Sequence, residues 1–108
     1  MASLSSDRYT PFTHQISETI TTVPAVATDL TTTDTRIWQI TVANTTAGAL
    51  TFTLKDRQAT PRYICAAVSI AANTTYILAW PEGQFGYSGL NWSGSGAGLE
   101  ASVVGCYK

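Results

Sequence analysis

Apolar and polar residues alternate along most of this chain, which is the pattern of β-strands that bury one face. The clearest example spans residues 36–43, where the alternation places Trp38, Ile40 and Val42 on one face of a strand. Ile37, between the polar positions, falls on the opposite face in this register. We therefore expect Trp38 to lie in the core together with Ile40 and Val42.

A second alternating segment follows at residues 50–54, after a short polar stretch at residues 44–48. This stretch begins with Asn44 and contains Gly48, two residue types that tolerate positive φ and therefore favour turns. The two alternating segments and the turn between them predict a β-hairpin.

Shorter apolar runs are separated by Gly, Asn and Pro, and each of them is expected to form a strand. These runs lie at residues 62–70, 75–80, 90–93 and 99–107. Pro81 is expected to end the second run, because proline cannot donate a hydrogen bond to a β-ladder.

The beginning of the chain is less regular. Residues 15–23 read as a weak strand or an arm, and residues 24–34 as a loop or a second short strand. No segment shows apolar residues at helical spacing. We expect an all-β protein, a single antiparallel β-sandwich of Ig-like or jelly-roll-like type with six to eight strands. Residues 14–108 would form this sandwich and residues 1–13 an N-terminal arm.

Composition changes this picture in one respect, because charge is scarce and threonine takes its place. Charged residues make up 12% of the 108 residues, against roughly 25% in an average soluble domain. A strand face of threonines is weakly hydrated and weakly repulsive, and we expect such faces to pack against copies of the chain or a host lattice. The net charge of −1 gives no basic field for nucleic acid or for an acidic membrane surface.

The sequence also lacks the patterns of membrane or secretory segments. It has no run of about 18 apolar residues, which a membrane span requires, and residues 1–10 have no apolar core of a signal peptide. Export is therefore not expected. Without export, Cys65 and Cys106 are expected to be reduced, buried thiols, although the sequence leaves a disulfide between them open.

The residues that could carry chemistry are few. His14 is the only histidine, and with Cys65 and Cys106 it makes an unconvincing ligand set, because zinc usually takes three or four such ligands. Glu82 and Glu100 could form the pair of carboxylates that a glycosidase needs, but surface carboxylates without this role are far commoner. The chain has neither a nucleophile elbow nor a phosphate-binding loop. We expect no metal, no cofactor and no enzymatic activity.

The most distinctive feature is an aromatic segment at residues 80–87, with Trp92 nearby. Its side chains could anchor a neighbouring subunit, because aromatic residues are enriched at interfaces. They could also stack on a sugar, with Glu82 and Asn91 as polar partners, or simply close one end of the sandwich. The residues predicted to bind a partner are Phe12, Trp80, Phe85, Tyr87 and Trp92.

Three stretches, at residues 38–46, 50–54 and 68–76, are similar to known proteins in their strand and Asn-Thr turn pattern. The last of them contains Ala-Asn-Thr-Thr between two strands. Together they resemble small β-sandwich proteins of tailed-bacteriophage virions, which decorate capsids or sit on tails. This resemblance implies a non-enzymatic structural part, and decoration proteins of this kind are often trimers.

These observations lead to one functional hypothesis and one alternative. The chain is expected to be a capsid decoration or cement subunit of the virion, which binds the capsid lattice or its own copies. Its partners would be the major capsid protein or another virion protein, and it would form a homo-oligomer, with a trimer favoured. The alternative is a carbohydrate-binding module or a tail-tip accessory protein.

Overall fold

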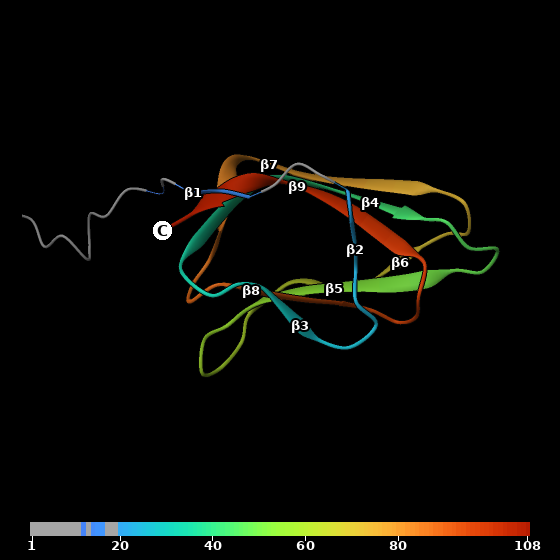
Figure 1. Ribbon diagram of the computed structural model, residues 1–108, viewed down its shortest axis with the longest axis horizontal. Helices are drawn as coiled ribbons and strands as arrows, with labels where there is room; N and C mark the ends of the chain where they lie inside the picture. Colours follow the sequence, from blue (N-terminus) through green and yellow to red (C-terminus); the bar gives the residue numbers. More distant parts are fainter. Residues whose placement is uncertain (1–11, 13, 17–19) are drawn as a thin grey trace, which may run out of the picture.

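The computed structural model describes Phe12, residues 14–16 and residues 20–108, which form two antiparallel β-sheets packed face to face (Figure 1). The described strands are β1 (His14–Gln15), β2 (Thr21–Thr22), β3 (Thr28–Thr31), β4 (Thr35–Asn44), β5 (Leu50–Asp56), β6 (Tyr63–Ile70), β7 (Thr75–Gly86), β8 (Leu90–Gly94) and β9 (Leu99–Tyr107). One sheet, here called sheet A, has the order β1-β9-β4-β7, and β2 also pairs with β9. The other, sheet B, has the order β3-β8-β5-β6. The predicted all-β antiparallel sandwich is confirmed, with nine described strands where six to eight were expected.

The strand order is that of a jelly roll, one of the two arrangements expected. Strands β5 and β6 form a hairpin at the centre of the sequence. The other strands pair symmetrically around it: β4 with β7, β3 with β8, and both β1 and β2 with β9. From β2 onward, every connection except β5–β6 passes from one sheet to the other. This is a long antiparallel hairpin wound into two layers, as in jelly rolls.

The hairpin predicted between residues 36–43 and 50–54 is wrong, because β4 lies in sheet A and β5 in sheet B. The buried side chain of Asn44 makes the corner between the sheets. Its Nδ2 donates to the carbonyl oxygens of Gly48 and Ile70, both at 2.9 Å. Its Oδ1 accepts hydrogen bonds from the amide and the hydroxyl of Thr46, at 2.9 and 2.7 Å. The corner does not use positive φ at either Asn44 or Gly48.

A β-bulge in β4 also corrects the predicted position of Trp38. Ile37 pairs with Gly105 and Gln39 with Val104, so that Trp38 is an additional residue without a counterpart on β9. A bulge of this kind shifts the alternation by one residue. As a result, Ile37 joins the buried side chains, and Trp38 is only half-buried.

Pro81 does not end its strand, contrary to the expectation. Strand β7 continues to Gly86 and lies at the edge of sheet A. Its register with β4 shifts between Ala79 and Gln84, opposite the bulge at Trp38. Proline is tolerated on an edge strand at such an irregularity, because no ladder hydrogen bond is needed there.

The core lies between the sheets and is formed by apolar side chains from both. Leu99, Ala101 and Val103 alternate inward from β9 as predicted, and Phe52 and Leu54 do so from β5. The fully buried or nearly buried apolar residues are Val23, Ile37, Ile40, Val42, Phe52, Leu54, Cys65, Ile70, Leu90, Trp92, Leu99, Ala101 and Val103. The two cysteines are both free. Cys65 in sheet B is buried as expected, whereas Cys106 in sheet A is only half-buried. Burial raises the pKa of the Cys65 thiol to about 11.

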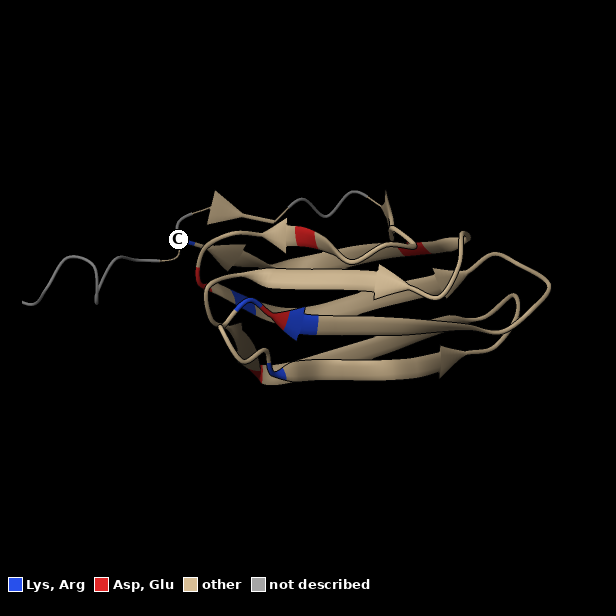
Figure 2. Cartoon of the chain, turned by 90° about the horizontal axis from the view of Figure 1, so that it is seen from below, with Lys and Arg blue, Asp and Glu red and all other residues tan. Residues whose placement is uncertain are grey.

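Charged residues gather at one end of the sandwich (Figure 2). Among the described residues, those at this end are Asp29, Asp34, Arg36, Lys55, Asp56, Arg57, Arg62, Glu82 and Lys108. The opposite end is formed by the turns at residues 45–49, 71–74 and 95–98, which contain no charged residue. Glu100 is the only described charge near that end. The charge is therefore distributed unevenly along the long axis of the molecule, which has a charged end and an uncharged end.

Candidate interaction surface

The outer face of sheet A carries an aromatic cluster at its charged end. The ring of Phe85, on β7, packs edge-on against Phe12 with centroids 6.1 Å apart. The ring of Tyr87 stacks on the same Phe85 at 5.9 Å. Edge-to-face and offset-stacked pairs at such distances are favourable aromatic geometries. Phe85 is 38% and Tyr87 is 48% exposed, so the cluster is a surface feature that is ordered by its own contacts.

Arg36 extends this cluster across β4. It pairs in register with Phe85, which places both side chains on the outer face. The centre of its guanidinium lies 5.1 Å from the ring centroid of Trp38 and 5.2 Å from that of Phe85. One guanidinium nitrogen donates to the carbonyl oxygen of Glu82. Cation–π contacts to two rings hold this arginine in place.

The approach of Arg36 to β7 requires a glycine at position 83. Gly83 has a φ of +85°, and a Cβ atom there would lie 2.3 Å from the Nε of Arg36. This Nε is buried and has no hydrogen-bond partner among the described residues. The bulge opposite Trp38 and the glycine together create the space that the guanidinium occupies.

A shallow groove lies beside the cluster, between β1 and β9. It has a volume of about 320 Å³, and its walls include Phe12, Trp38, Val104 and Cys106. Lys108 lies beside Phe12, with Nζ 5.3 Å from the centroid of its ring. The groove and the cluster form one surface, on which aromatic and aliphatic groups are bordered by fixed cations.

Apart from Glu100, which pairs with Ala43 near the uncharged end, the rest of the outer face of sheet A is apolar or neutral. Ile77 on β7 is 61% exposed and Val104 on β9 is 40% exposed. Ile20, which is 68% exposed, borders a second shallow hollow on this face. The register places these small or neutral residues between them: Gln39, Thr41, Ala43, Thr75, Ala79 and Ser102. Large exposed aliphatic groups on one sheet face indicate an interaction surface.

The outer face of sheet B differs, because hydroxyl groups cover it. Thr51 pairs with Ser69, and Thr53 pairs with Ser93, each pair lying on this face. Lys55 and Tyr63 lie near its charged end, with Nζ 5.9 Å from the ring centroid. The threonine-rich face expected from composition is thus found on sheet B, and the more apolar face is found on sheet A.

Comparison of the chain with protein-family models, with curated proteins and with solved structures finds no match. The surface chemistry therefore carries the functional interpretation.

The predicted partner-binding residues do not all lie on one surface. Phe12, Phe85 and Tyr87 are brought together on the outer face of sheet A. Trp80 lies on the inner side of β7, where it packs partly buried against the core. Trp92 is 4% exposed and packs into the core from sheet B, edge-on to Phe52 at 6.4 Å. The structure thus places Trp92 in the core and Trp80 only partly at the surface, and only Phe12, Phe85 and Tyr87 of the predicted residues form the surface cluster.

Arg36 and Trp38 belong to this surface and were missed. Their spacing of two residues was a signal that both could lie on one face of a strand. It was overridden because Trp38 also alternates with Ile40 and Val42, and large aromatics are usually assigned to the core. Only the bulge, which depends on pairing with β9, resolves the ambiguity.

The described residues offer little for catalysis or metal binding. Glu82 lies beside Arg36 and Glu100 pairs with Ala43, so the two carboxylates are roughly 20 Å apart along β4 at the usual rise per residue. The described part of the chain contains no group of three potential metal ligands. His14 stacks on Tyr107 with centroids 5.2 Å apart. The described part of the chain also has no helix that is long and apolar enough to cross a membrane.

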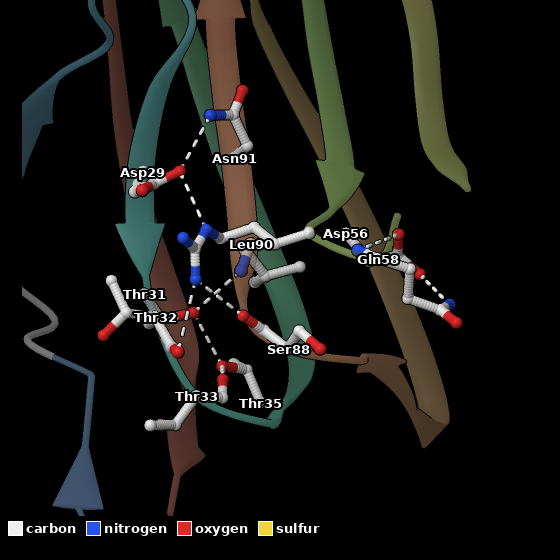
Figure 3. A network of polar contacts seen from close by, with 11 residues as sticks. Asp29, Thr31, Thr32, Thr33, Thr35, Asp56, Gln58, Ser88, Leu90 and Asn91 are labelled. Carbon is white, nitrogen blue, oxygen red and sulfur yellow. Dashed lines mark hydrogen bonds and ion pairs between the residues drawn. The ribbon is translucent and has the colours of Figure 1, made fainter. Parts of the chain in front are cut away.

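A network of polar contacts ties the loops together at the charged end of sheet B (Figure 3). Asp29 accepts a hydrogen bond from the side-chain Nδ2 of Asn91 and forms an ion pair with the Nε of Arg57, both at 3.0 Å. Arg57 also donates to the carbonyl oxygen of Ser88 at 2.9 Å. In the interior, the hydroxyl of Thr31 accepts a hydrogen bond from the amide of Leu90 at 3.0 Å. These contacts join three segments, and all their polar groups serve the fold.

Asp56 has a similar structural role at the end of β5, where it is 3% exposed. Its carboxylate accepts a hydrogen bond from the backbone amide of Arg62 at 2.9 Å. It also accepts one from the side chain of Gln58 at 2.7 Å (Figure 3). Burial by itself raises the pKa of Asp56, but these hydrogen bonds outweigh burial, and the pKa lies below its ordinary value of 3.8. The ionised carboxylate therefore holds the loop at residues 57–62.

We expect Asp56→Asn to lower the free energy of unfolding at pH 7 by about 1–3 kcal/mol, because charge-assisted hydrogen bonds are weakened in a buried position. Since the folded-state pKa is depressed, this stabilisation is complete above pH 3.8 and disappears as the pH falls through the folded-state pKa. Urea unfolding from pH 7 to pH 2.5 measures the difference between wild type and variant. A difference that stays constant over this range contradicts the role of the ionised carboxylate.

Proposed function

We propose that this chain is a non-enzymatic structural protein of a virion, a capsid decoration or cement subunit that binds the capsid lattice through the outer face of sheet A. The observation that carries the proposal is the combination of exposed Ile77 and Val104 with neutral neighbours on that face. Water contact with such a surface is unfavourable by about 25 cal/mol per Å² of apolar area, and covering it by another protein recovers this free energy.

The aromatic cluster supports the same interpretation. Aromatic residues and arginine are enriched at protein interfaces, whereas lysine, glutamate and aspartate are depleted there. Arg36, Phe85 and Tyr87 are held in place by one another before any partner binds. Such preorganisation lowers the entropy cost of binding. The cluster would bind the partner at the charged end of the sheet, and Ile77 and Val104 would contact it in the middle of the face.

Two further observations support a place in a virion. The chain resembles small β-sandwich proteins of phage particles at residues 38–46, 50–54 and 68–76. The jelly-roll order of its strands also occurs in viral capsid proteins. The major capsid protein, or another virion protein, is the partner proposed for the face of sheet A.

The carbohydrate-binding alternative has less support. The residues considered for stacking on a sugar are split between the surface, where Tyr87 lies, and the interior, where Trp80 and Trp92 pack. The side-chain Nδ2 of Asn91 already donates a hydrogen bond to Asp29. No single described surface therefore combines the groups that this alternative requires.

Attachment to particles tests the proposal. Particles assembled without the chain are mixed with purified protein, and the bound fraction is measured by sedimentation. We expect wild type to bind and Val104→Lys to lose at least tenfold in affinity, because a lysine would enter the centre of the covered face. Val26→Lys, at a residue 76% exposed in the loop before β3, is the matched control and should bind like wild type. Unchanged attachment of Val104→Lys, or no attachment of wild type, overturns the proposal.

A further inference from the structure

The outer edge of β7 presents unpaired backbone groups. Strand β7 is the last strand of sheet A, with β4 on one side and no described strand on the other. The amide of Asn44 donates to the carbonyl oxygen of Thr74 at 2.8 Å, which fixes the alternation of the ladder. Tyr76 and Leu78 then bond to β4, and Thr75, Ile77 and Ala79 direct their N–H and C=O groups toward the free edge.

This edge lacks the usual protection against strand pairing. Exposed edges are normally blocked by charged residues, proline, bulges or very short strands. Residues 71–80 contain neither charge nor proline, and Pro81 and Glu82 come only where β7 leaves its regular register. Tyr76 and Ile77 are exposed at 39% and 61%. The free segment is therefore regular and apolar, and it is long enough to accept another strand.

We propose that β7 pairs with β7 of a second copy of this chain, in antiparallel orientation about a two-fold axis at Ile77. Ile77 would lie opposite the partner's Ile77, and Thr75 opposite the partner's Ala79. In this register, the outward N–H and C=O groups of each pair face one another and exchange hydrogen bonds. The two A sheets become one continuous sheet across the dimer.

A second copy fits this edge better than an unrelated strand, because the edge is complementary to itself. Every position that faces the axis is uncharged, so identical strands meet without repulsion. Strand β7 runs from the uncharged end of the sandwich to the charged end. An antiparallel pair therefore directs the two charged ends away from each other. Two Ile77 side chains, each exposed in the single chain, cover one another on the outer face.

The proposed pairing is independent of the virion role and would double the surface that a lattice could contact. It also replaces the trimer implied by the family resemblance with a two-fold dimer. Ile77 belongs to both proposed contacts, whereas Val104, two strands away on β9, belongs only to the lattice contact. Variants at these two positions therefore separate a failure of the dimer from a failure of the lattice attachment.

Light scattering and sedimentation equilibrium of the full chain test the dimer. We expect wild type at about 50 μM to have a mass of about 23 kDa, twice the 11.5 kDa of one chain. Ile77→Lys places like charges opposite each other and should give a monomer, with a dissociation constant raised at least 100-fold. Ile77→Thr, which stays neutral and β-branched, should remain a dimer, as should Val104→Lys and Val26→Lys.

Hydrogen exchange provides a second readout that does not depend on mass. The backbone amides at positions 77 and 79 should exchange slowly in wild type and at least tenfold faster in Ile77→Lys. The backbone amides of Tyr76 and Leu78 should stay protected in both proteins. Protection of Tyr76 and Leu78 also shows that the variant is folded. A wild-type monomer, a trimer, or a dimer that Ile77→Lys and Val26→Lys leave equally intact overturns the proposal.

Discussion

Replacing Trp92 by alanine is expected to lower the free energy of unfolding by about 3–5 kcal/mol, the usual cost of deleting a large aromatic side chain from a core. Trp92 is 4% exposed and packs edge-on against Phe52, and both belong to the core between the two sheets. The loss is a large fraction of the stability of a small domain. Urea unfolding followed by far-ultraviolet circular dichroism measures it.

Tyr87→Ala is the matched control, because Tyr87 is an aromatic of the same segment that lies on the surface at 48% exposure. We expect this variant to lose about 1 kcal/mol or less, since it removes mainly one exposed stacking contact. A small loss for Trp92→Ala, together with a large loss of partner binding, would return Trp92 to the surface role that its sequence neighbourhood suggested.

Asn44→Ala is expected to lower the free energy of unfolding by about 2–3 kcal/mol, since it leaves several buried polar groups without partners. The side-chain amide joins the corner between β4 and β5 to the end of β6, through the carbonyl oxygens of Gly48 and Ile70. Its oxygen also fixes the backbone at Thr46. The same denaturation experiment measures the loss, and proteolysis at residues 45–49 should become faster.

Thr45→Ala provides the comparison for Asn44. The hydroxyl of Thr45 donates to the carbonyl oxygen of Gly98 at 2.9 Å, but this contact is exposed. Water can replace it, and we expect a loss below about 1 kcal/mol. Equal losses for the two variants would show that the corner does not depend on the buried amide.

Most strands could be predicted from the sequence, because a strand that buries one face has apolar and polar residues in alternation. The alternation of Leu99, Ala101 and Val103 is an example, and all three are buried as expected. The same rule failed for Trp38, because the bulge that displaces it is set by pairing with β9, more than sixty residues further along the chain. The prediction that Pro81 ends its strand was wrong for a related reason, since only the sheet order shows that β7 lies at an edge.

The arrangement of the strands was less accessible than their existence. Residues 44–48 carry ordinary turn residues, and a turn between two alternating segments favours a hairpin. The structure makes a corner there, because the buried Asn44 amide bonds to Ile70 on a strand of the other sheet. Such a long-range partner leaves no trace in the local pattern. Both the Ig-like and the jelly-roll order were therefore compatible with the sequence.

The candidate surface was predicted in part. The aromatic segment drew attention to Phe85 and Tyr87, and both lie in the cluster on sheet A. Composition alone could not separate them from Trp92, because residue type does not show on which side of a sheet a side chain lies. Of the predicted N-terminal arm, only Phe12 belongs to the described residues, and it packs against Phe85. The remainder of the arm lies outside them.

Hydroxyl-radical footprinting of the chain in its native particle and in isolation tests the central claim, that another protein covers the outer face of sheet A. The account predicts that Val104 and Phe85 are oxidised at least fivefold more slowly in the particle, while Tyr63, on the outer face of sheet B and 61% exposed, reacts at the same rate in both. Ile77→Lys protein, if monomeric, provides the isolated reference without the proposed dimer contact. Equal oxidation of Val104 and Phe85 in particle and isolated chain would contradict the account.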